Sequence, residues 1–228
     1  MPTLYIANRN YSSWSLVPWV LLRQRGIPFD EKLVPFQGNA THAAFQKFSP
    51  SGKVPCLVDG AITVWDSLAI IEYLAEAHPQ VWPADTAARA FARCVAAEMH
   101  SGFMPLRTQC GMNCGVRVRL HRVDAALRDD LARLDALCAE GLHRFGGPFL
   151  AGSAFSAADA VYAPVAFRLQ TFDPPVAAAT RAYFQHVLGL APMQDWYRAA
   201  LAETWRDAGH DAEAAEWGTV TGDLRTGA

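Results

Sequence analysis

The chain has 228 residues, of which 51% are hydrophobic and 18% are charged. This size and composition predict a compact enzyme built from one large domain or two small ones. Its 20 basic and 22 acidic residues give a formal net charge of −2 and are spread along the chain, which excludes a basic tract for nucleic acid or anionic lipid. The N-terminus lacks a signal-peptide pattern and no apolar run approaches about 18 residues, so we expect a cytoplasmic protein without a membrane partner.

The first 78 residues alternate strand and helix patterns, and the remainder is helical almost throughout. The early elements are expected as a strand over 3–7, a helix over 14–25 closed by Gly26, a strand over 29–34 and a weak helix within 40–48. After a linker over 79–84, helices are expected near 85–113, 119–144, 157–171, 176–189 and 191–205. We therefore predict a mixed domain over 1–78 and an all-helical domain over 85–228, whose last residues, 206–228, form a loosely packed tail.

A hairpin followed by a helix is the most informative feature of the first domain. Val54-Pro55 opens an extended apolar run, because the residue before a proline is pushed out of the helical region. Asp59-Gly60 is typical of a two-residue hairpin turn. Asp66-Ser67 then precedes an amphipathic helix, for which we expect Ser67 as the N-cap. The free N–H groups of such a helix start can bind a carboxylate.

A second helix start, at Ser156, carries Asp159 three residues later. Serine and aspartate at this spacing predict a variant capping box, in which each side chain satisfies an unpaired backbone N–H group. Capping boxes occur in many unrelated helices, so this one by itself indicates helix initiation only.

Five cysteines, an odd number, predict reduced thiols rather than a disulfide framework. Cys110 and Cys114 form the only close pair, and their spacing could place both on one helical face. No further Cys or His pair nearby completes a zinc site. We therefore expect ordinary packing of these thiols and no bound metal.

Residues 49–57 read SPSGKVPCL and residues 66–74 read DSLAIIEYL. This pair of segments resembles the hairpin motif of the glutathione transferase superfamily. The superfamily has a thioredoxin-like α/β N-terminal domain with the order βαβαββα, followed by an all-α domain whose core helix begins with a cap like that at Ser156. The resemblance covers residues 3–205. It implies a cis Val54–Pro55 bond, backbone pairing of Val54 with glutathione, and a γ-glutamyl end held by Asp66 and Ser67.

Lys53 precedes Val54 and has the family role of contacting the glycine end of glutathione. A solvated loop lysine is the alternative reading. Theta- and delta-class transferases carry a histidine where this chain has Gly52, which leaves the contacts at the glycine end open.

The turn after the first strand is where the glutathione sulfur would lie. A free thiol has a pKa near 8.5, and lowering it by about two units requires about 2.7 kcal/mol of preferential thiolate stabilisation. A hydroxyl donor at a helix N-terminus can supply that magnitude. Pro18 is tolerated only in a first helical turn, which predicts a helix start near Ser13 or Trp14. The serines therefore stand at the cap.

The run Ser12-Ser13-Trp14-Ser15 resembles the catalytic serine segment of zeta-class transferases and the single serine of theta- and delta-class ones. The resemblance implies that Ser12 stabilises the thiolate, with Ser13 in support and Trp14 beside glutathione. Without the hairpin motif, the serines would be read simply as competing N-caps. A tyrosine mechanism would need the phenol near residue 7 or 8, and a cysteine mechanism would need a thiol within 12–15; neither is present.

The second substrate is expected between the first helix and the helical domain. The candidate residues are Tyr11, Phe103, Met104, Arg107 and Arg168. Core packing is the alternative for Phe103 and Met104, and pairing with a helix carboxylate is the alternative for the two arginines. Pro105 is expected to kink the first long helix. Zeta-class isomerases carry an arginine where this chain has Thr171, one turn after Arg168, which weakens an assignment as maleylacetoacetate isomerase.

The function predicted from these features is that of a glutathione transferase. A serine-stabilised glutathione thiolate would attack a small apolar electrophile, with glutathione as cosubstrate and no metal or redox cofactor. The family usually forms two-fold homodimers, which we also expect here. Alternatives are a glutathione-dependent isomerase or dehalogenase, or a non-catalytic glutathione-binding or regulatory protein on the same scaffold.

Overall fold

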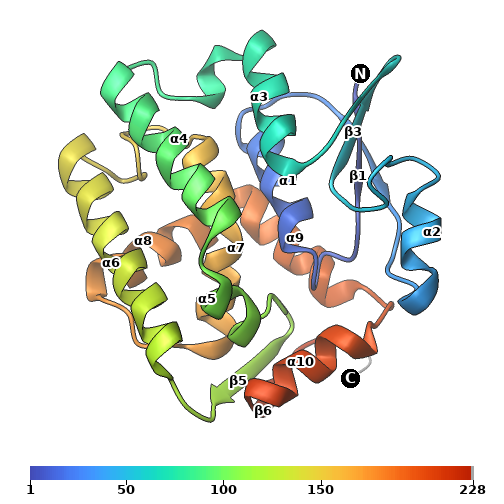
Figure 1. Ribbon diagram of the computed structural model, residues 1–228, viewed down its shortest axis with the longest axis vertical. Helices are drawn as coiled ribbons and strands as arrows, with labels where there is room; N and C mark the ends of the chain where they lie inside the picture. The colour runs from blue at the N-terminus through green and yellow to red at the C-terminus, as the bar shows by residue number, and fades with distance from the viewer. Residues whose placement is uncertain (227–228) are drawn as a thin grey trace.

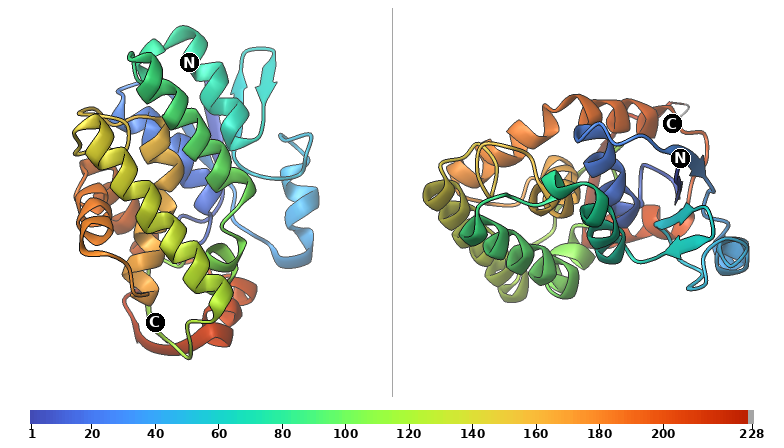
Figure 2. Two further views of the ribbon diagram at one scale, coloured as in Figure 1. Left: turned by 60° about the vertical axis from the view of Figure 1, so that its left-hand side comes forward. Right: turned by 90° about the horizontal axis from the view of Figure 1, so that it is seen from above.

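The computed structural model describes residues 1–226 and has a small sheet on one side and a helical layer on the other, with α1 and α3 between them (Figures 1 and 2). Four strands form the sheet: β1 (Thr3–Ile6), β2 (Asp30–Leu33), β3 (Cys56–Asp59) and β4 (Ile62–Val64). Their order is β2-β1-β3-β4, with β1 and β2 parallel and the other pairs antiparallel.

The helices of this half complete the order predicted for a thioredoxin-like domain. They are α1 (Ser13–Gln24), the short turn η1 (Gly38–Ala40) with α2 (Thr41–Phe45), and α3 (Ser67–Ala77). The hairpin between β3 and β4 turns at Asp59-Gly60, where Gly60 has a φ of +59° that favours glycine. The Val54–Pro55 bond is cis, as the resemblance implied. The order βαβαββα is therefore confirmed.

The helical half is organised around α7 (Ala157–Phe172), which packs against α1, α4 and α8. Nearly every residue of α7 is buried, as expected for a helix that is apolar all round. Its neighbours are η2 (Pro79–Val81), α4 (Thr86–Ser101), α5 (Met104–Gln109), α6 (Ala125–Phe145), α8 (Ala178–Leu188) and α9 (Ala191–Ala202). None of the helices within residues 1–226 combines the length and apolar character that a membrane crossing requires.

The first long helix is broken rather than kinked, which corrects the prediction for Pro105. Helix α4 ends at Ser101, and Phe103 adopts the left-handed region with a φ of 54° before α5 begins. Pro105 lies in the first turn of α5, where its missing N–H group is tolerated. The chain therefore restarts as a new helix instead of bending the old one.

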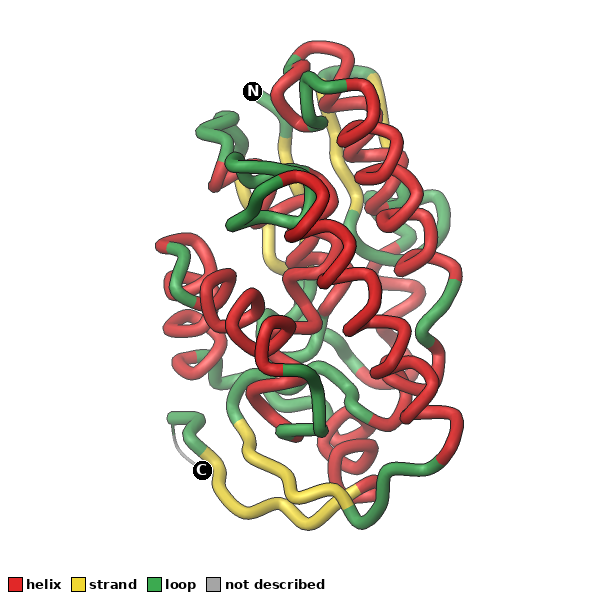
Figure 3. Tube along the Cα trace, turned by 90° about the vertical axis from the view of Figure 1, so that its left-hand side faces the viewer, coloured by secondary structure: helices red, strands yellow, loops and turns green. Residues whose placement is uncertain are grey.

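The C-terminal segment corrects a second prediction. Residues 206–228 were expected to form a loosely packed tail, but the segment contains α10 (Ala208–Trp217) and β6 (Gly218–Asp223). Residues 227–228 of that prediction lie outside the described residues. Strand β6 pairs antiparallel with β5 (Val116–Leu120), which replaces the start of the helix expected over 119–144 (Figure 3). The alternation of Val and Arg in 116–119 is a strand pattern that the helical reading overlooked.

Candidate functional site

Two adjacent hollows form one groove along the start of α1 and the segment that precedes β3. The hollow of about 460 Å³ is lined from the first domain and α10, and the hollow of about 390 Å³ from the first domain, the end of α4 and α5. The residues that line both are Trp14, Lys53 and Val54. The sequence-predicted Ser12 and Ser13 line the larger hollow, while Pro55, Asp66 and Ser67 line the smaller one. The structure thus brings together the residues expected to hold glutathione.

The start of α1 presents two serine hydroxyls to the groove. Ser12 occupies the N-cap position and is buried; its hydroxyl donates to the Ser15 hydroxyl at 2.7 Å. The backbone N–H of Ala7 donates to the same Ser15 oxygen at 3.2 Å, which fixes that side chain against β1. The Ser13 hydroxyl makes no hydrogen bond to any other part of residues 1–226. The free amide groups of the first helical turn add a positive dipole end here.

The start of α3 presents a carboxylate to the other end of the groove. Asp66, not Ser67 as predicted, is the N-cap, and it accepts from the Leu68 N–H at 3.0 Å. Its second oxygen, Oδ2, lies 2.8 Å from Nε2 of His100 at the end of α4. The Asp66 side chain is still 54% exposed, so it can accept a further donor.

Trp14 separates the groove from the helical half. The His100 ring lies against it with centroids 5.3 Å apart, and the Arg107 guanidinium lies over its ring at 4.8 Å. Arg107 also donates to the carbonyls of His100 and Gly102, at 3.4 and 3.2 Å. Its charge is therefore anchored at the break between α4 and α5.

The other residues predicted for the second substrate do not meet in one pocket. Phe103 is buried edge-on against Tyr162, whereas Met104 is 54% exposed. Arg168 is buried and donates to the carbonyls of Arg107 and Cys110, at 3.0 and 2.6 Å, and burial lowers its pKa to about 10. Arg168 thus satisfies backbone carbonyls rather than a helix carboxylate.

Tyr11 is held by the C-terminal segment. Its hydroxyl donates to Asp211 at 3.1 Å and accepts from Arg225 at 2.8 Å, and burial raises its pKa. The His210 ring stacks on Tyr11 and on Phe36, and it lines the larger hollow. Sequence reasoning missed His210 because it regarded residues 206–228 as a tail.

His42 is a second residue that sequence reasoning missed. It lines the larger hollow from α2 and packs against Gly52, where an added Cβ would lie 2.3 Å from the imidazole ring. Gly52 has a φ of +63°, so both its conformation and this close approach favour glycine. Lys53 lines both hollows, whereas His42 lines only the larger one, which does not contain Asp66.

The cysteines pack as expected. All five are free, and burial raises the pKa of Cys110 and Cys138 to about 12, which opposes thiolate formation. Within residues 1–226, no three His, Cys, Asp or Glu side chains are grouped as a metal site.

The fold and this groove define a protein with a thioredoxin-like half, a helical half and a site at the starts of α1 and α3. The family model described as Glutathione S-transferase, N-terminal domain matches residues 11–77, and the model for the C-terminal domain of the same family matches residues 117–212. Together they cover more than half of the chain. The chain belongs to the glutathione S-transferase family.

Individual proteins agree with this placement. A probable maleylacetoacetate isomerase from Caenorhabditis elegans is 28% identical over 181 residues, which cover 75% of this chain and 80% of that protein. A glutathione transferase homologue from Burkholderia gl BGR1, solved with bound glutathione, is 25% identical with a TM-score of 0.66 and covers 87% of this chain and 97% of that one. A theta-class transferase from Xanthomonas axonopodis shares the fold, with 23% identity, a TM-score of 0.64, and coverage of 86% of this chain and 96% of its own.

Proposed function

We propose that reduced glutathione lies along the groove with its γ-glutamyl end at Asp66 and Ser67 and its glycine carboxylate near Lys53. The charges of the groove support this direction, because Asp66 is the one carboxylate among the described residues that line it, and Lys53 and His42 line the hollow without a carboxylate. Val54 lines both hollows, so its backbone can pair with the central cysteinyl residue. Trp14 then forms the wall beside the ligand.

The glutathione sulfur lies at the start of α1 in this arrangement. Ser12 is our first choice for the donor to the sulfur; its O–H, which donates to Ser15 in this structure, would turn to the sulfur when glutathione binds. The neighbouring Ser13 hydroxyl, which lines the same hollow, is the second choice. Shifting a thiol pKa from about 8.5 to about 6.5 takes about 2.7 kcal/mol, which a charge-assisted hydrogen bond and the helix dipole together can provide. The presence of two serines at the helix start that opens on the groove is the observation that carries this proposal.

The ionised sulfur then attacks an electrophilic carbon of a small apolar substrate. A carbon–sulfur bond forms, the leaving group departs with its electron pair or an alkene or epoxide opens, and the thiol proton passes to solvent or to the leaving group. Tyr11 and Arg107 are the predicted second-substrate residues that line the groove, and we place the electrophile beside them and next to Trp14.

Titration of bound glutathione tests the serine mechanism. The thiolate absorbs in the ultraviolet, so its fraction can be followed against pH in wild type, Ser12→Ala and Ser13→Ala. We expect Ser12→Ala to raise the pKa of the bound thiol by about one to two units, with little change in glutathione affinity. An unchanged thiolate fraction in both variants would reject the serine mechanism while leaving glutathione binding intact.

Glutathione-dependent isomerisation is the second candidate, favoured by the likeness to the Caenorhabditis elegans protein named a probable maleylacetoacetate isomerase. In that reaction the thiolate adds to the substrate and is later expelled, so no conjugate accumulates. Product analysis with maleyl compounds and with aryl halides separates the two reactions. Arg168 donates to two backbone carbonyls through Nη1 alone, so its Nη2 and Nε groups remain available to an anionic substrate in the hollow that Arg168 lines with Ser13, Trp14 and Arg107.

We also propose a cytoplasmic homodimer. Ile62 and Trp65 lie at the sheet edge next to the glutathione groove, and they are 50% and 43% exposed. Large apolar side chains that are this exposed are typical of a surface that a partner covers, so we place the contact between the two subunits there. Analytical ultracentrifugation of wild type and Trp65→Glu would test it, because a buried carboxylate should shift the protein to monomers.

A further inference from the structure

The wall that α10 supplies to the larger hollow carries a histidine held by an aspartate. His210 lies in the first turn of α10, and Figure 1 shows this helix beneath the loop that joins β1 to α1. Its ring nitrogen Nδ1 lies 2.8 Å from Oδ1 of Asp207, which is the N-cap of the same helix. Burial alone would raise the pKa of Asp207, but hydrogen bonds from His210 outweigh it and lower that pKa. The carboxylate is therefore ionised and accepts from Nδ1, which leaves Nε2 as the lone-pair nitrogen of the neutral ring.

The His210 ring is held in one orientation, and one of its nitrogens stays free. Tyr11 and Phe36 both stack on the ring, with centroids 5.1 and 5.0 Å away and planes inclined by 24° and 25°. Within residues 1–226, Nε2 makes no hydrogen bond, and the side chain is 33% exposed. The stacked rings and Asp207 therefore fix the imidazole, and Nε2 remains able to bond a group in the hollow.

The end of the chain holds α10 and the Tyr11 phenol together. Arg225 donates to Asp211 on α10 at 2.7 Å and to the Tyr11 hydroxyl at 2.8 Å. The Tyr11 hydroxyl in turn donates to Asp211 at 3.1 Å, and burial raises its pKa. The phenol proton is thus already bonded within the protein, although Tyr11 lines the hollow beside the place proposed for the electrophile. The neighbouring group with an unengaged nitrogen is His210.

Two other imidazoles line the groove, and their surroundings differ. Nε2 of His100 is engaged by Asp66 at the start of α3, at 2.8 Å. His42 packs against Gly52, which precedes Lys53. Among the described histidines of the two hollows, His210 is the one that contacts Tyr11.

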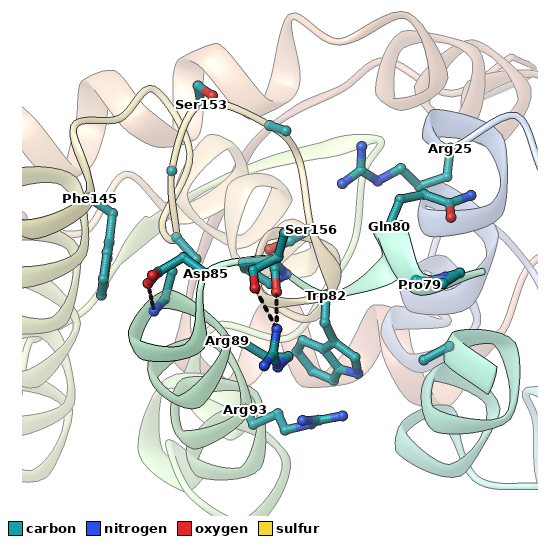
Figure 4. A pocket seen from close by; sticks show the side chains of 17 residues that line it. Arg25, Pro79, Gln80, Trp82, Asp85, Arg89, Arg93, Phe145, Ser153 and Ser156 are labelled. Carbon is teal, nitrogen blue, oxygen red and sulfur yellow. Dashed lines mark hydrogen bonds between the residues drawn. The ribbon is translucent and has the colours of Figure 1, made fainter. Parts of the chain in front are cut away.

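The largest cavity of the described residues offers no comparable group. It has a volume of about 1180 Å³, lies where α1 and α3 end, and shares no lining residue with the groove (Figure 4). Its charged lining residues are three arginines, which stay protonated, and Asp85, which caps α4. No histidine, cysteine or tyrosine is among the described residues that line it. Proton transfer near neutral pH is therefore located in the groove.

We propose that His210 is a catalytic proton donor for electrophiles on which thiolate attack leaves a negative charge on oxygen or carbon, such as epoxides and activated alkenes. This inference rests on the proposed function. Nε2 takes the proton of the glutathione thiol as the thiolate forms. The sulfur then bonds to an epoxide carbon, the carbon–oxygen bond breaks with its electron pair going to oxygen, and Nε2 returns the proton to that oxygen. Asp207 stabilises the imidazolium that exists between these two proton transfers.

Aryl halides make no such demand on the protein. The sulfur bonds to the ring carbon, and the halide leaves with the electron pair of its bond, so it needs no proton. The imidazolium then releases its proton to solvent. Loss of the imidazole should therefore slow epoxide opening selectively, because the serine-stabilised thiolate still forms without it.

Two electrophiles test the proposal on the full chain at saturating reduced glutathione. Chlorodinitrobenzene loses chloride, whereas nitrophenyl glycidyl ether opens to an alkoxide. We expect His210→Gln to lower kcat for the epoxide about tenfold or more and to change kcat for the halide by less than about twofold. His121→Gln is the matched control, since His121 is exposed, bonds Thr219 at 3.3 Å and does not line the groove. Both of its kcat values should equal those of wild type.

A second variant separates the charge of the aspartate from the fold of α10. Asp207→Asn keeps an oxygen that can cap the helix and hold Nδ1, but it removes the charge that stabilises the imidazolium. It should lower the ratio of epoxide to halide kcat about threefold.

The halide rate distinguishes failure of this inference from failure of the proposed function. An unchanged ratio of epoxide to halide kcat in His210→Gln would overturn the role of His210 and leave the proposed function intact. A wild-type protein that turns over the halide but not the epoxide would do the same. If wild type turned over neither electrophile, the proposed function and this inference would be overturned together.

Discussion

The starts of α3 and α7 carry the same two residue types, aspartate and serine, in different surroundings. Asp66 and Ser67 begin α3 at the groove, and Ser156 and Asp159 begin α7 in the core. The Asp66 side chain is 54% exposed and accepts from one backbone N–H group, with His100 beside it. Asp159 is fully buried, and its oxygens accept from the N–H groups of Leu150 and Ser156 and from two hydroxyl groups.

This difference shows that burial, rather than the local motif, separates a helix cap that is closed within the core from one that a ligand can reach. At the start of α7, the Asp159 oxygens and the Ser156 hydroxyl are engaged within the protein, so they are not available to a ligand. At the groove, the same carboxylate caps its helix and keeps an accessible lone pair. A helix start with serine and aspartate can therefore bind a ligand only where the tertiary structure leaves its carboxylate exposed.

Replacement of the buried aspartate should have the largest effect on stability. Asp159→Ala leaves the N–H groups of Leu150 and Ser156 and the Tyr183 hydroxyl without their acceptor, so we expect a loss of about 3–5 kcal/mol in the free energy of unfolding. Urea denaturation measures this loss. Glutathione affinity of the folded fraction should stay close to that of wild type, and a stability change below about 1 kcal/mol would contradict the comparison.

The exposed aspartate should show the reverse pattern. Asn caps helices as well as Asp does, so Asp66→Asn should change the free energy of unfolding by less than about 0.5 kcal/mol. In the proposed arrangement the Asp66 charge pairs with the glutathione amino group, so its loss should weaken glutathione binding about tenfold or more, as measured by calorimetric titration. A variant that binds glutathione as wild type does would remove Asp66 from the site.

Ser156 and Ser67 form a matched pair, and their replacement should have smaller effects on stability and on glutathione affinity. Ser156→Ala should cost about 1 kcal/mol of stability, because a capping hydroxyl is lost, and should leave glutathione affinity unchanged. Ser67 follows the cap, so Ser67→Ala should cost little stability but lower glutathione affinity by about 1 kcal/mol, or about fivefold. If both variants behaved alike in the two assays, the distinction between the helix starts would fail.

The pH dependence of stability is the finest test. Burial raises the pKa of Asp159 above the unfolded value of about 3.9. The folded state then binds this proton more tightly, so the carboxyl contributes its full stability below the unfolded pKa and loses that contribution as the pH rises through the folded pKa. The stability of wild type relative to Asp159→Asn should therefore decline as the pH rises above about 3.9. A stability of wild type relative to Asp159→Asn that increases with pH would contradict the raised pKa of Asp159.

Much of the first domain follows from local pattern. The hairpin at Asp59-Gly60, the extended run after Pro55 and the helix closed near Gly26 each depend on near neighbours in the chain, and each is found where the pattern predicts it. The capping box at Ser156 is likewise local and is present. Helix α7 appears with nearly its predicted bounds because its apolar run has no competing structure.

The parts that the sequence did not reveal depend on distant partners. Strand β5 exists because β6, about a hundred residues later, pairs with it, as the register of Arg119 with Thr219 shows. The contacts of Tyr11 with Asp211 and Arg225 span some two hundred residues. Which of the candidate arginines is buried depends on where α5 ends, because Arg168 donates to the carbonyls of Arg107 and Cys110 in the last turn and at the C-cap of that helix.

The sequence by itself determined the family, the order βαβαββα and part of the groove lining, such as Ser12, Trp14 and Val54, since hairpin turns, helix caps and apolar periodicity act over a few residues. Only the tertiary structure decided that Asp66 caps α3 beside His100 and that α10 brings His210 to the groove. These outcomes depend on which surfaces pack together, and the free energy of that packing is a property of the whole chain.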